Sequence, residues 1–171
     1  MILGQPGSGK STLARKLGAA TGLPVFHMDH IHWKSGWVPR DEAEKFEMAR
    51  EVMARKTWIF EGGFSKTWDE RAQRADTLIW LDVGLWRRLW RVTYRFFRYY
   101  GKSRPDLPDG CAEGNWGEMW DFYKWIWNTR DTARVKMAGM VETYSGSLDV
   151  IVMRTIPEVE AYLDAVRARA A

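Results

Sequence analysis

One segment near the start of the chain constrains its fold more than any other feature. Residues 4–12 read GQPGSGKST and match the pattern G-x-x-x-x-G-K-[ST] in full. In this pattern the glycines let backbone N–H groups turn toward phosphate oxygens, the lysine places a charge on the terminal phosphates, and the next hydroxyl can bind Mg²⁺. The pattern needs a strand before it and a helix after it, and the sequence predicts both, at residues 1–3 and 10–20. We therefore predict a site for nucleotide phosphates formed by Gly4, Pro6, Gly7, Ser8, Gly9, Lys10, Ser11 and Thr12, with Ser11 as the Mg²⁺ ligand.

Short apolar runs alternate with helical patterns along the rest of the chain. Further strands are predicted at residues 25–28, 58–60, 77–81 and 150–153, and helices at residues 41–56 and 157–168. Such alternation is typical of a parallel sheet with helices on both faces, whose ligands bind at the carboxyl ends of the strands. The sequence thus predicts an α/β three-layer sandwich of the P-loop NTPase type, with a five-stranded parallel sheet. Gly4, Asp29, Glu61 and Asp82 should lie together at its ligand edge.

The connection between the fourth and fifth strands is unusually long. It contains a predicted helix at residues 86–100, a loop rich in proline and glycine at 101–115, and a second helix at 116–143. A helix–loop–helix insertion at the ligand edge is typical of a mobile lid, which we place at about residues 87–134. A tryptophan-rich segment at about residues 33–56 should lie on the substrate side.

Composition bounds the remaining possibilities. The 171 residues favour one domain, and the net charge of +4 suits an anionic small molecule as well as nucleic acid. A single cysteine, Cys111, excludes an internal disulfide and suits the cytoplasm. No apolar run is long enough to span a membrane, so we expect no membrane partner. We also expect a monomer or a weak dimer.

All three histidines of the chain fall in the segment His27-Met-Asp29-His30-Ile-His32. Histidine and aspartate at short spacing are typical zinc ligands. On an extended strand, however, alternate residues face opposite sides, which would separate His27 and Asp29 from the other two histidines. Asp29 suits a general base, or a residue that binds Mg²⁺ through water, and the alternative is a helix or turn cap.

Four more features mark a possible substrate site. Trp33 and Trp37 lie in a loop that should overhang the site, where their rings would either stack on a substrate or pack in the core. In Glu61-Gly62-Gly63, the acidic residue can hold water on Mg²⁺ and the glycines allow close approach. Arg71 should lie within reach of an anionic group, the alternative being a solvated arginine.

The first lid helix carries a basic stripe. Arg87, Arg91, Arg95 and Arg98 recur at spacings of four, four and three, opposite an aromatic face. A solvated face, a membrane surface or a nucleic-acid contact would each explain the stripe. Over a phosphate loop, arginines would offset charge on a transferring phosphoryl group, and Arg130 and Arg134 on the return helix would add to this.

These residues together resemble the P-loop kinase superfamily of adenylate, shikimate and gluconate kinases. The chain resembles more closely the bacterial adenylate-kinase-related proteins labelled DNA topology modulation (FlaR-like) proteins. This resemblance lies in the stretches FHMDHIHWKSGW, WIFEGGF, ADTLIWLD and MRTIPEVEAYL. The resemblance implies a single P-loop kinase-like domain over residues 1–171 with strand order 2-3-1-4-5. It also implies that Arg91 and Arg95 precede the lid, that Arg130 and Arg134 follow it, and that residues from Arg154 to Pro157 pack on adenine.

Two classes of function follow from these features. The leading hypothesis is an ATP- and Mg²⁺-dependent kinase that acts on a small molecule through an alcohol or phosphate group. Lys10, Asp29, Arg91, Arg95, Arg130 and Arg134 would carry its catalysis. The alternative is a nucleotide-binding regulator whose basic surface contacts DNA. A kinase should turn its arginines toward the phosphate loop, whereas a DNA-binding protein should carry a continuous basic surface elsewhere.

Overall fold

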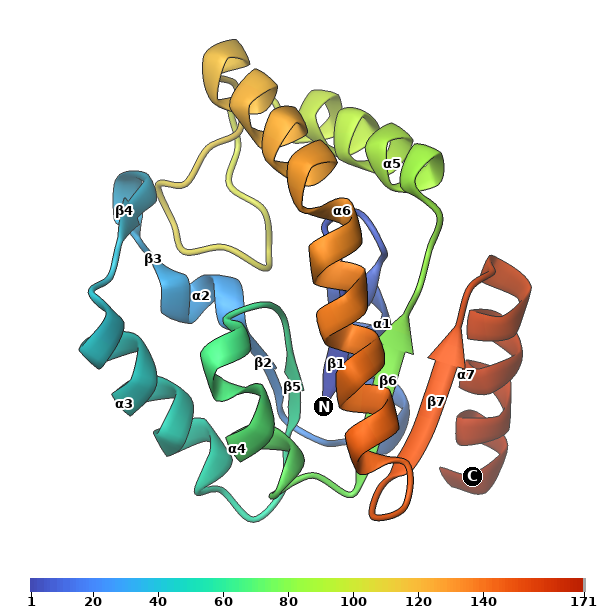
Figure 1. The fold of residues 1–171 in the computed structure, drawn as a ribbon. Coiled ribbons are helices and arrows are strands. Elements are labelled where there is room, and N and C mark those ends of the chain that lie inside the picture. Colours follow the sequence, from blue (N-terminus) through green and yellow to red (C-terminus); the bar gives the residue numbers. More distant parts are fainter. Residues whose placement is uncertain (171) are drawn as a thin grey trace.

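Five short apolar segments form one parallel sheet in the computed structural model, which describes residues 1–170 (Figure 1). They are β1 (Ile2–Gly4), β2 (Val25–His27), β5 (Ile59–Glu61), β6 (Thr77–Leu81) and β7 (Asp149–Met153). Their spatial order is β2-β5-β1-β6-β7. In chain order this is 2-3-1-4-5, so the predicted α/β class and strand order are confirmed. The labels β3 and β4 belong to a separate small hairpin that the sequence did not predict.

The strand before the phosphate loop lies in the middle of the sheet. Ile2 of β1 pairs in register with Glu61 of β5 on one side and with Ile79 of β6 on the other. Three residues therefore suffice for β1, because both of its edges are hydrogen-bonded. The loop that follows leaves the sheet at its centre, at the carboxyl edge.

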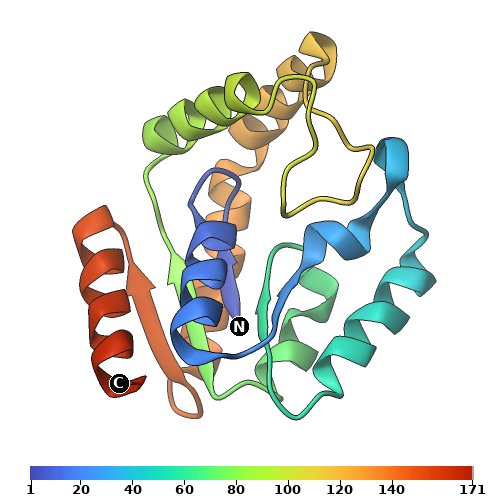
Figure 2. The same ribbon diagram turned by 180° about the vertical axis from the view of Figure 1, so that it is seen from behind.

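Two helices cover one face of the sheet (Figure 2). They are α1 (Lys10–Thr21) and α7 (Ile156–Ala170). Leu13 and Leu17 of α1 and Leu163 of α7 are buried against strand residues such as Ile2 and Ile79. Helix α1 ends at Gly22, whose φ of 73° is left-handed and whose N–H donates to the Gly18 carbonyl, a common helix stop.

The opposite face is covered by α4 (Trp68–Ala72) and by the second half of the long helix α6 (Trp116–Tyr144) (Figure 1). Met137 and Met140 of α6 pack there with Leu3, Leu78 and Trp80 of the strands. Neighbouring strand residues thus face opposite layers, as the pleat of a β-strand requires. The result is a three-layer sandwich.

The segment after β2 departs from the sequence prediction. A strand was expected through residue 28, but β2 ends at His27 and the chain turns at once into the short helix α2 (Met28–His32). The hairpin of β3 (Trp33–Lys34) and β4 (Val38–Pro39) follows, with a 3-10 turn at Ser35–Trp37 between them. Next comes α3 (Glu42–Met53), whose N-cap Asp41 accepts a hydrogen bond from the Glu44 N–H at 2.8 Å.

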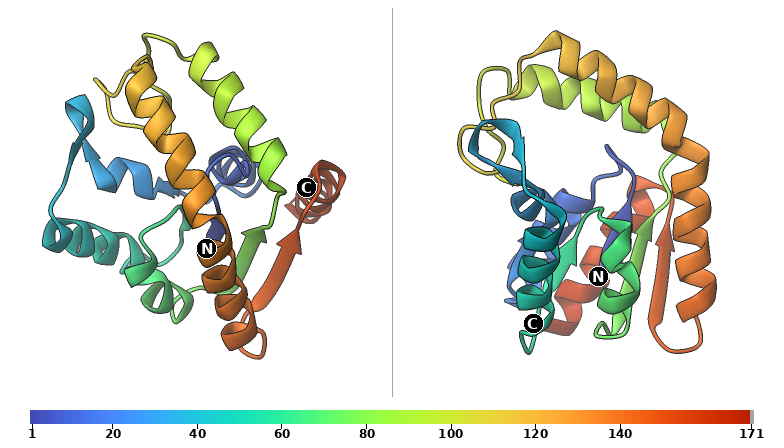
Figure 3. Two further views of the ribbon diagram at one scale, coloured as in Figure 1. Left: turned by 45° about the horizontal axis from the view of Figure 1, so that its top comes forward. Right: turned by 60° about the vertical axis from the view of Figure 1, so that its left-hand side comes forward.

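A helical roof spans the ligand edge of the sheet (Figure 3). It consists of α5 (Leu85–Arg98), the loop at residues 99–115 and the first half of α6. Val92 and Phe96 of α5 pack with Met119 and Ile126 of α6 in a small core of their own. Figure 3 shows α6 leaving this roof and running down beside the sheet, so one helix joins the lid to the core. Within residues 1–170, no helix is both long and apolar enough to cross a membrane.

Candidate functional site

The phosphate loop connects β1 to α1 in a conformation that needs glycine. Gly7 and Gly9 have φ values of 77° and 99°, in the left-handed region that side chains disfavour. A Cβ atom at Gly7 would also overlap the backbone carbonyl oxygen of Arg88 on α5. The loop therefore fits closely beneath the roof. The Ser8 N–H donates to the Gln5 carbonyl at 3.1 Å, and the N–H groups at the start of α1 face the position of a ligand.

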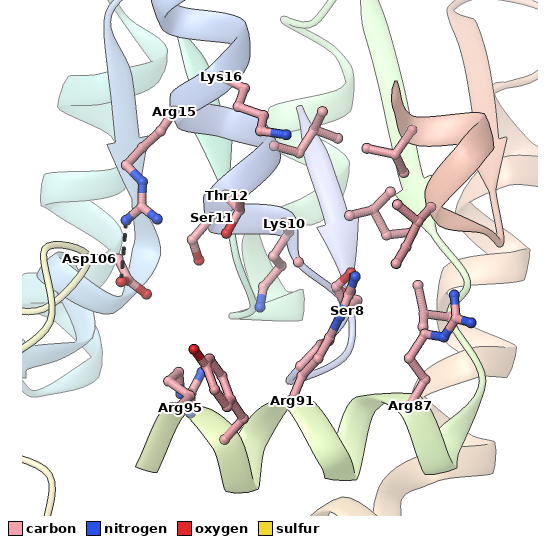
Figure 4. A pocket seen from close by; sticks show the side chains of 18 of the residues that line it. Ser8, Lys10, Ser11, Thr12, Arg15, Lys16, Arg87, Arg91, Arg95 and Asp106 are labelled. Carbon is pink, nitrogen blue, oxygen red and sulfur yellow. Dashed lines mark hydrogen bonds and ion pairs between the residues drawn. The ribbon is translucent and has the colours of Figure 1, made fainter. Parts of the chain in front are cut away.

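A cavity of about 450 Å³ lies on one side of this loop, and we call it the small cavity. Its walls come from the loop and α1, from α5, and from the turn after β7. Figure 4 shows Arg87, Arg91 and Arg95 of α5 opposite Lys10 and Ser11 of the loop. The loop residues that line the small cavity are Gly7, Ser8, Gly9, Lys10, Ser11 and Thr12, and Arg154 lines it from the turn after β7.

The predicted basic stripe faces this cavity. Arg87, Arg91, Arg95 and Arg98 all line it. Arg91 already contacts the loop, because its Nη1 donates to the Ser8 carbonyl oxygen at 2.8 Å. The stripe thus points to the phosphate loop, as the kinase hypothesis requires.

A larger cavity of about 980 Å³ lies on the other side of the loop, and we call it the large cavity. Gly4 and Pro6 of the phosphate loop line it, together with Gly63 after β5. Its aromatic walls are Trp33, Trp37, Phe64, Trp68, Phe96, Phe122 and Trp125.

Two aromatic residues of the large cavity have strained backbones. Trp37 and Phe64 are the only non-glycine residues of the described chain with positive φ, at 60° and 59°. Trp37 is held there by an edge contact with Trp33 at 5.3 Å between ring centroids and by a hydrogen bond from its Nε1 to the Ala112 carbonyl at 3.0 Å. Strain of this kind gathers at functional sites, which supports the expectation that Trp33 and Trp37 contact a ligand.

Three cations line both cavities. They are Lys10 from the phosphate loop, Arg95 from α5 and Arg104 from the lid loop. Arg104 is buried and is held by Asp106 at 3.0 Å and by Glu113 at 2.9 Å. Sequence reasoning did not identify Arg104, because Glu113 meets it only when the lid loop folds back on itself, as the bridge from Ser103 to Ala112 shows.

Asp29 lies in the wall of the large cavity, close to Lys10. It belongs to α2 and not to the end of a strand, which corrects the geometry assumed for the histidine segment. Burial raises the pKa of Asp29 above its ordinary value; Lys10 and Arg104 oppose this, and Glu61 adds to it. A carboxyl group with a raised pKa beside a phosphate loop suits proton transfer.

Glu61 is sealed beneath the phosphate loop. Its Oε1 accepts a hydrogen bond of 2.6 Å from Nδ1 of His27, and its Oε2 is buried without a partner. Burial alone would raise the pKa of Glu61, but His27, Lys10 and Ser11 outweigh burial and hold it below the usual range. An ionised carboxylate with an unsatisfied oxygen beside Ser11 fits Mg²⁺, which usually keeps water ligands and binds only one or two protein groups.

The histidines do not gather into a metal site. Nε2 of His30 lies 3.2 Å from the Pro105 carbonyl oxygen. The ring of His32 packs edge-to-face with that of Trp33, with 4.6 Å between the ring centroids. Within residues 1–170, no group of three or more histidine, cysteine or acidic side chains is placed to hold a metal ion.

The position of Arg71 differs from the one that the sequence predicted. The side chain was expected to reach an anionic ligand, but it is fully buried and lines neither cavity. Its guanidinium donates to the carbonyls of Gly62 and Gly63 at 3.1 Å each and lies 4.0 Å from the centre of the Phe60 ring. Burial lowers the pKa of Arg71 to about 9, and Glu61 opposes this effect. Arg71 thus fixes the turn after β5 from below.

The return-helix arginines also lie outside both cavities. Arg134 forms a two-pronged ion pair with Asp82 at the end of β6, at 2.9 and 2.8 Å. Arg130 stacks on Trp127 at 4.6 Å and donates to the Trp127 carbonyl. Neither side chain lines a cavity in this structure, although the Arg130 carbonyl accepts a hydrogen bond from Gln5 of the phosphate loop at 2.5 Å. Pro157 lines neither cavity as well.

No protein-family model matches the chain, and no curated protein matches it at a significant level. Among solved structures it is similar to a deoxyadenosine kinase from M. mycoides, determined with bound dCTP. The two are 12% identical, the similarity covers 98% of this chain and 97% of that one, and the TM-score is 0.48. This level of similarity establishes neither a family nor a substrate for the chain.

Proposed function

We propose that the protein transfers the terminal phosphoryl group of ATP to a small molecule bound in the large cavity. The observation that carries this proposal is the shared wall of the two cavities, which contains Lys10, Arg95 and Arg104. A phosphoryl group that passes between two sites spreads negative charge at their boundary, and fixed cations there stabilise that charge.

ATP is proposed to bind in the small cavity. Its phosphates would lie along the phosphate loop at the start of α1, and its adenine would lie against residues 154–156, which form the far wall. Ser11 would coordinate Mg²⁺, and Glu61 or Asp29 would bind it through water. When bound, Mg²⁺ neutralises charge on the phosphate oxygens.

The acceptor is proposed to react through an oxygen that faces Asp29. If that oxygen belongs to a hydroxyl group, it forms a bond to the γ-phosphorus while the bond from the γ-phosphorus to the bridging oxygen breaks. ADP leaves with that electron pair, and Asp29 takes the hydroxyl proton. Arg91 and Arg95 on α5 would hold the transferring group, and the roof would exclude water that otherwise hydrolyses ATP.

The size and lining of the large cavity support a flat acceptor. Its aromatic side chains include the strained pair Trp37 and Phe64, which offer ring faces for stacking. A regulator that contacts DNA is the less favoured alternative, because its basic stripe should lie on a surface away from the phosphate loop.

The test is ADP release stimulated by candidate acceptors: nucleosides, nucleoside monophosphates, aromatic alcohols, sugars and hydroxy acids. At least one acceptor should raise ADP release in proportion to its own phosphorylation. Lys10→Met should abolish both, whereas Lys56→Met, an exposed lysine beyond α3, should match the wild type. ATP turnover unchanged in Lys10→Met would contradict the assignment of the phosphate loop.

A further inference from the structure

Arg88 is a buried cation without a protein partner. It lies on α5, its exposed fraction is 4%, and it lines the large cavity. Within residues 1–170 its side chain makes no hydrogen bond and no ion pair, and its Nε is sealed from solvent. On the same helix, Arg87, Arg91 and Arg98 line the small cavity alone, and Arg95 lines both cavities. Arg88 is thus the one arginine of α5 that lines the large cavity alone.

The two other buried arginines show what such a residue normally needs. Arg71 donates to two carbonyl oxygens and stacks on Phe60, and Arg104 is paired with Asp106 and Glu113. Burying a charged group without a partner is strongly unfavourable, so native proteins pair such groups or hold them for a ligand. Burial lowers the pKa of Arg88, and only Asp82 opposes this effect.

Four carboxylates line the large cavity, and neither Asp29 nor any of the other three forms an ion pair with Arg88. Glu113 forms an ion pair with Arg104, and Asp121 forms one with Lys124 at 3.0 Å. Glu118 accepts a hydrogen bond from the side-chain amide of Asn115 at 2.9 Å. Asp82 acts on Arg88 only through its charge, so a direct partner for the guanidinium is left to a bound molecule.

We propose that Arg88 is the anion-binding residue of the large cavity, so that the acceptor joins a flat ring to a carboxylate or phosphate group. The identification of this ligand as the acceptor rests on the proposed function. The anion site itself rests only on the burial of Arg88 and its lack of a partner.

The test compares two probes of nearly equal shape, para-hydroxymethylbenzoate and its uncharged amide, para-hydroxymethylbenzamide. Quenching of tryptophan fluorescence reports binding, with a non-hydrolysable ATP analogue and Mg²⁺ present so that the phosphate loop is filled. The wild type should bind the carboxylate about 10- to 100-fold more tightly than the amide, as a charged hydrogen-bonded pair predicts. Arg88→Met should reduce this preference to within about threefold, and Arg88→Lys should keep part of it. Arg167→Met, an exposed arginine on α7, is the matched control.

Equal affinity for the two probes in the wild type would overturn the anion site, and so would a preference that survives in Arg88→Met. The comparison in the wild type decides the matter even if Arg88→Met does not fold. Failure of every acceptor in the ADP-release assay would overturn the proposed function and leave the carboxylate preference to be judged by binding alone.

A second, independent feature is the outer surface of the roof. Four aromatic residues on each of α5 and α6 are exposed; Tyr94 and Trp125 line the cavities, and the other three on each helix share a spacing of four and seven positions. We call them the lid face: Trp86, Trp90 and Phe97 with Trp116, Trp120 and Trp127. The two rows are joined across the helices, since Trp86 lies 6.3 Å from Trp127 and Phe97 lies 5.6 Å from Trp116, between ring centroids.

The size of the lid face fits a protein interface. Its side chains are exposed by 46% to 75%, and at about 200 Å² for each fully exposed aromatic side chain they present roughly 700 Å². The largest apolar patch on a monomer is usually about 300–600 Å². One partner of a standard interface contributes about 800 Å².

Charges beside the lid face favour one occupant. Helix α5 contributes the exposed arginines Arg87 and Arg98, which also line the small cavity, and has no carboxylate. The lid half of α6 contributes the exposed Glu118 and the exposed pair of Asp121 with Lys124 at 3.0 Å, so Glu118 is the carboxylate there without a basic partner. A two-fold axis that sets α5 of one copy on α6 of another would bring these opposite charges together. Glu118 would repel an anionic lipid surface or DNA. We infer that the lid face binds the lid face of a second copy of this chain.

Sedimentation velocity over a concentration series tests this inference. The wild type should form a dimer, and Trp90→Glu, in the middle of the face, should be monomeric. Val135→Glu is the matched control, because Val135 is an equally exposed apolar residue two turns beyond Trp127 on α6. A wild type that stays monomeric would overturn the inference, as would a Trp90→Glu variant that still dimerises. Binding of the monomer to anionic vesicles would assign the face to a membrane instead.

Discussion

The surroundings of Asp29 shift its pKa in opposite directions. Burial raises its pKa, while Lys10 and Arg104 lower it. In the proposed reaction it takes the acceptor proton and must therefore be ionised. Because its pKa is raised, the acidic limb of the rate–pH profile should lie above the ordinary aspartate range, with kcat/KM rising with pH.

Asp29→Asn should lower kcat by about 100-fold or more, the usual loss when a general base is removed. ATP affinity should change little if Glu61 is the residue that binds Mg²⁺ through water, because Asp29 lines the large cavity only. The measurement is kcat and KM across a pH series for both proteins. An asparagine variant that keeps the wild-type rate, or the same acidic limb, would show that Asp29 acts only as a structural residue of α2.

At this scale the sequence predicted residues whose environment is local. The phosphate loop and the four arginines facing the small cavity followed from short-range patterns. Arg71, Arg134 and Arg88 did not, because the partner of an arginine is set by segments distant along the chain. Arg71 meets carbonyls after β5, Arg134 meets Asp82, and Arg88 meets none.

Between elements, the contact of β6 with α6 through Asp82 has a definite pH dependence. The hydrogen bond from Arg134 lowers the pKa of Asp82 below its ordinary value of 3.8, despite partial burial. The ionised carboxylate therefore stabilises the fold above that ordinary value, and this stabilisation is lost as pH falls through the lower folded value.

Asp82→Asn should lower the free energy of unfolding by about 0.5–1 kcal/mol at neutral pH, since Arg134 is largely exposed and the pair is screened by solvent. The difference between variant and wild type should shrink below about pH 4. Urea denaturation at neutral and acidic pH measures both. Asp164→Asn, which removes an exposed pair on α7, should have a smaller effect at either pH.

Element prediction succeeded where the pattern was long and failed where it was short. Helices α1, α5 and α6 and all five strands of the sheet were predicted within about two residues of their observed bounds. The turn from β2 into α2 was missed, because five helical residues are too few to show a helical period. The β3–β4 hairpin pairs only two residues on each side and left no alternating pattern.

For the whole molecule, eleven tryptophans were the least predictable feature. Sequence alone offered core packing or ligand stacking for them. The structure adds a third environment, because Trp86, Trp90, Trp116 and Trp120 lie on the outside of the roof. The matched spacing along two helices was readable in the sequence, but the side of the roof it would occupy depended on how the lid folds over the sheet.

The distribution of charge over the molecule also predicts how DNA binding would depend on salt and on ATP. Four arginines of α5 line the small cavity, where ATP is proposed to bind, and of these only Arg87 and Arg98 are exposed. Two phosphate contacts predict a shallow salt dependence, with a slope of log K against log salt of about −2. Because ATP would occupy the same arginines, ATP with Mg²⁺ should displace DNA from the protein.

Fluorescence anisotropy of a labelled duplex, titrated at several salt concentrations with and without ATP and Mg²⁺, measures both effects. Competition by ATP should disappear in Lys10→Met, which keeps every arginine but is expected to lose the nucleotide. A steep salt slope together with binding that ATP leaves unchanged would place a DNA site elsewhere on the molecule and favour the regulatory alternative. Weak binding that ATP abolishes would assign the arginines to the nucleotide, because two ligands that share the same cations exclude each other.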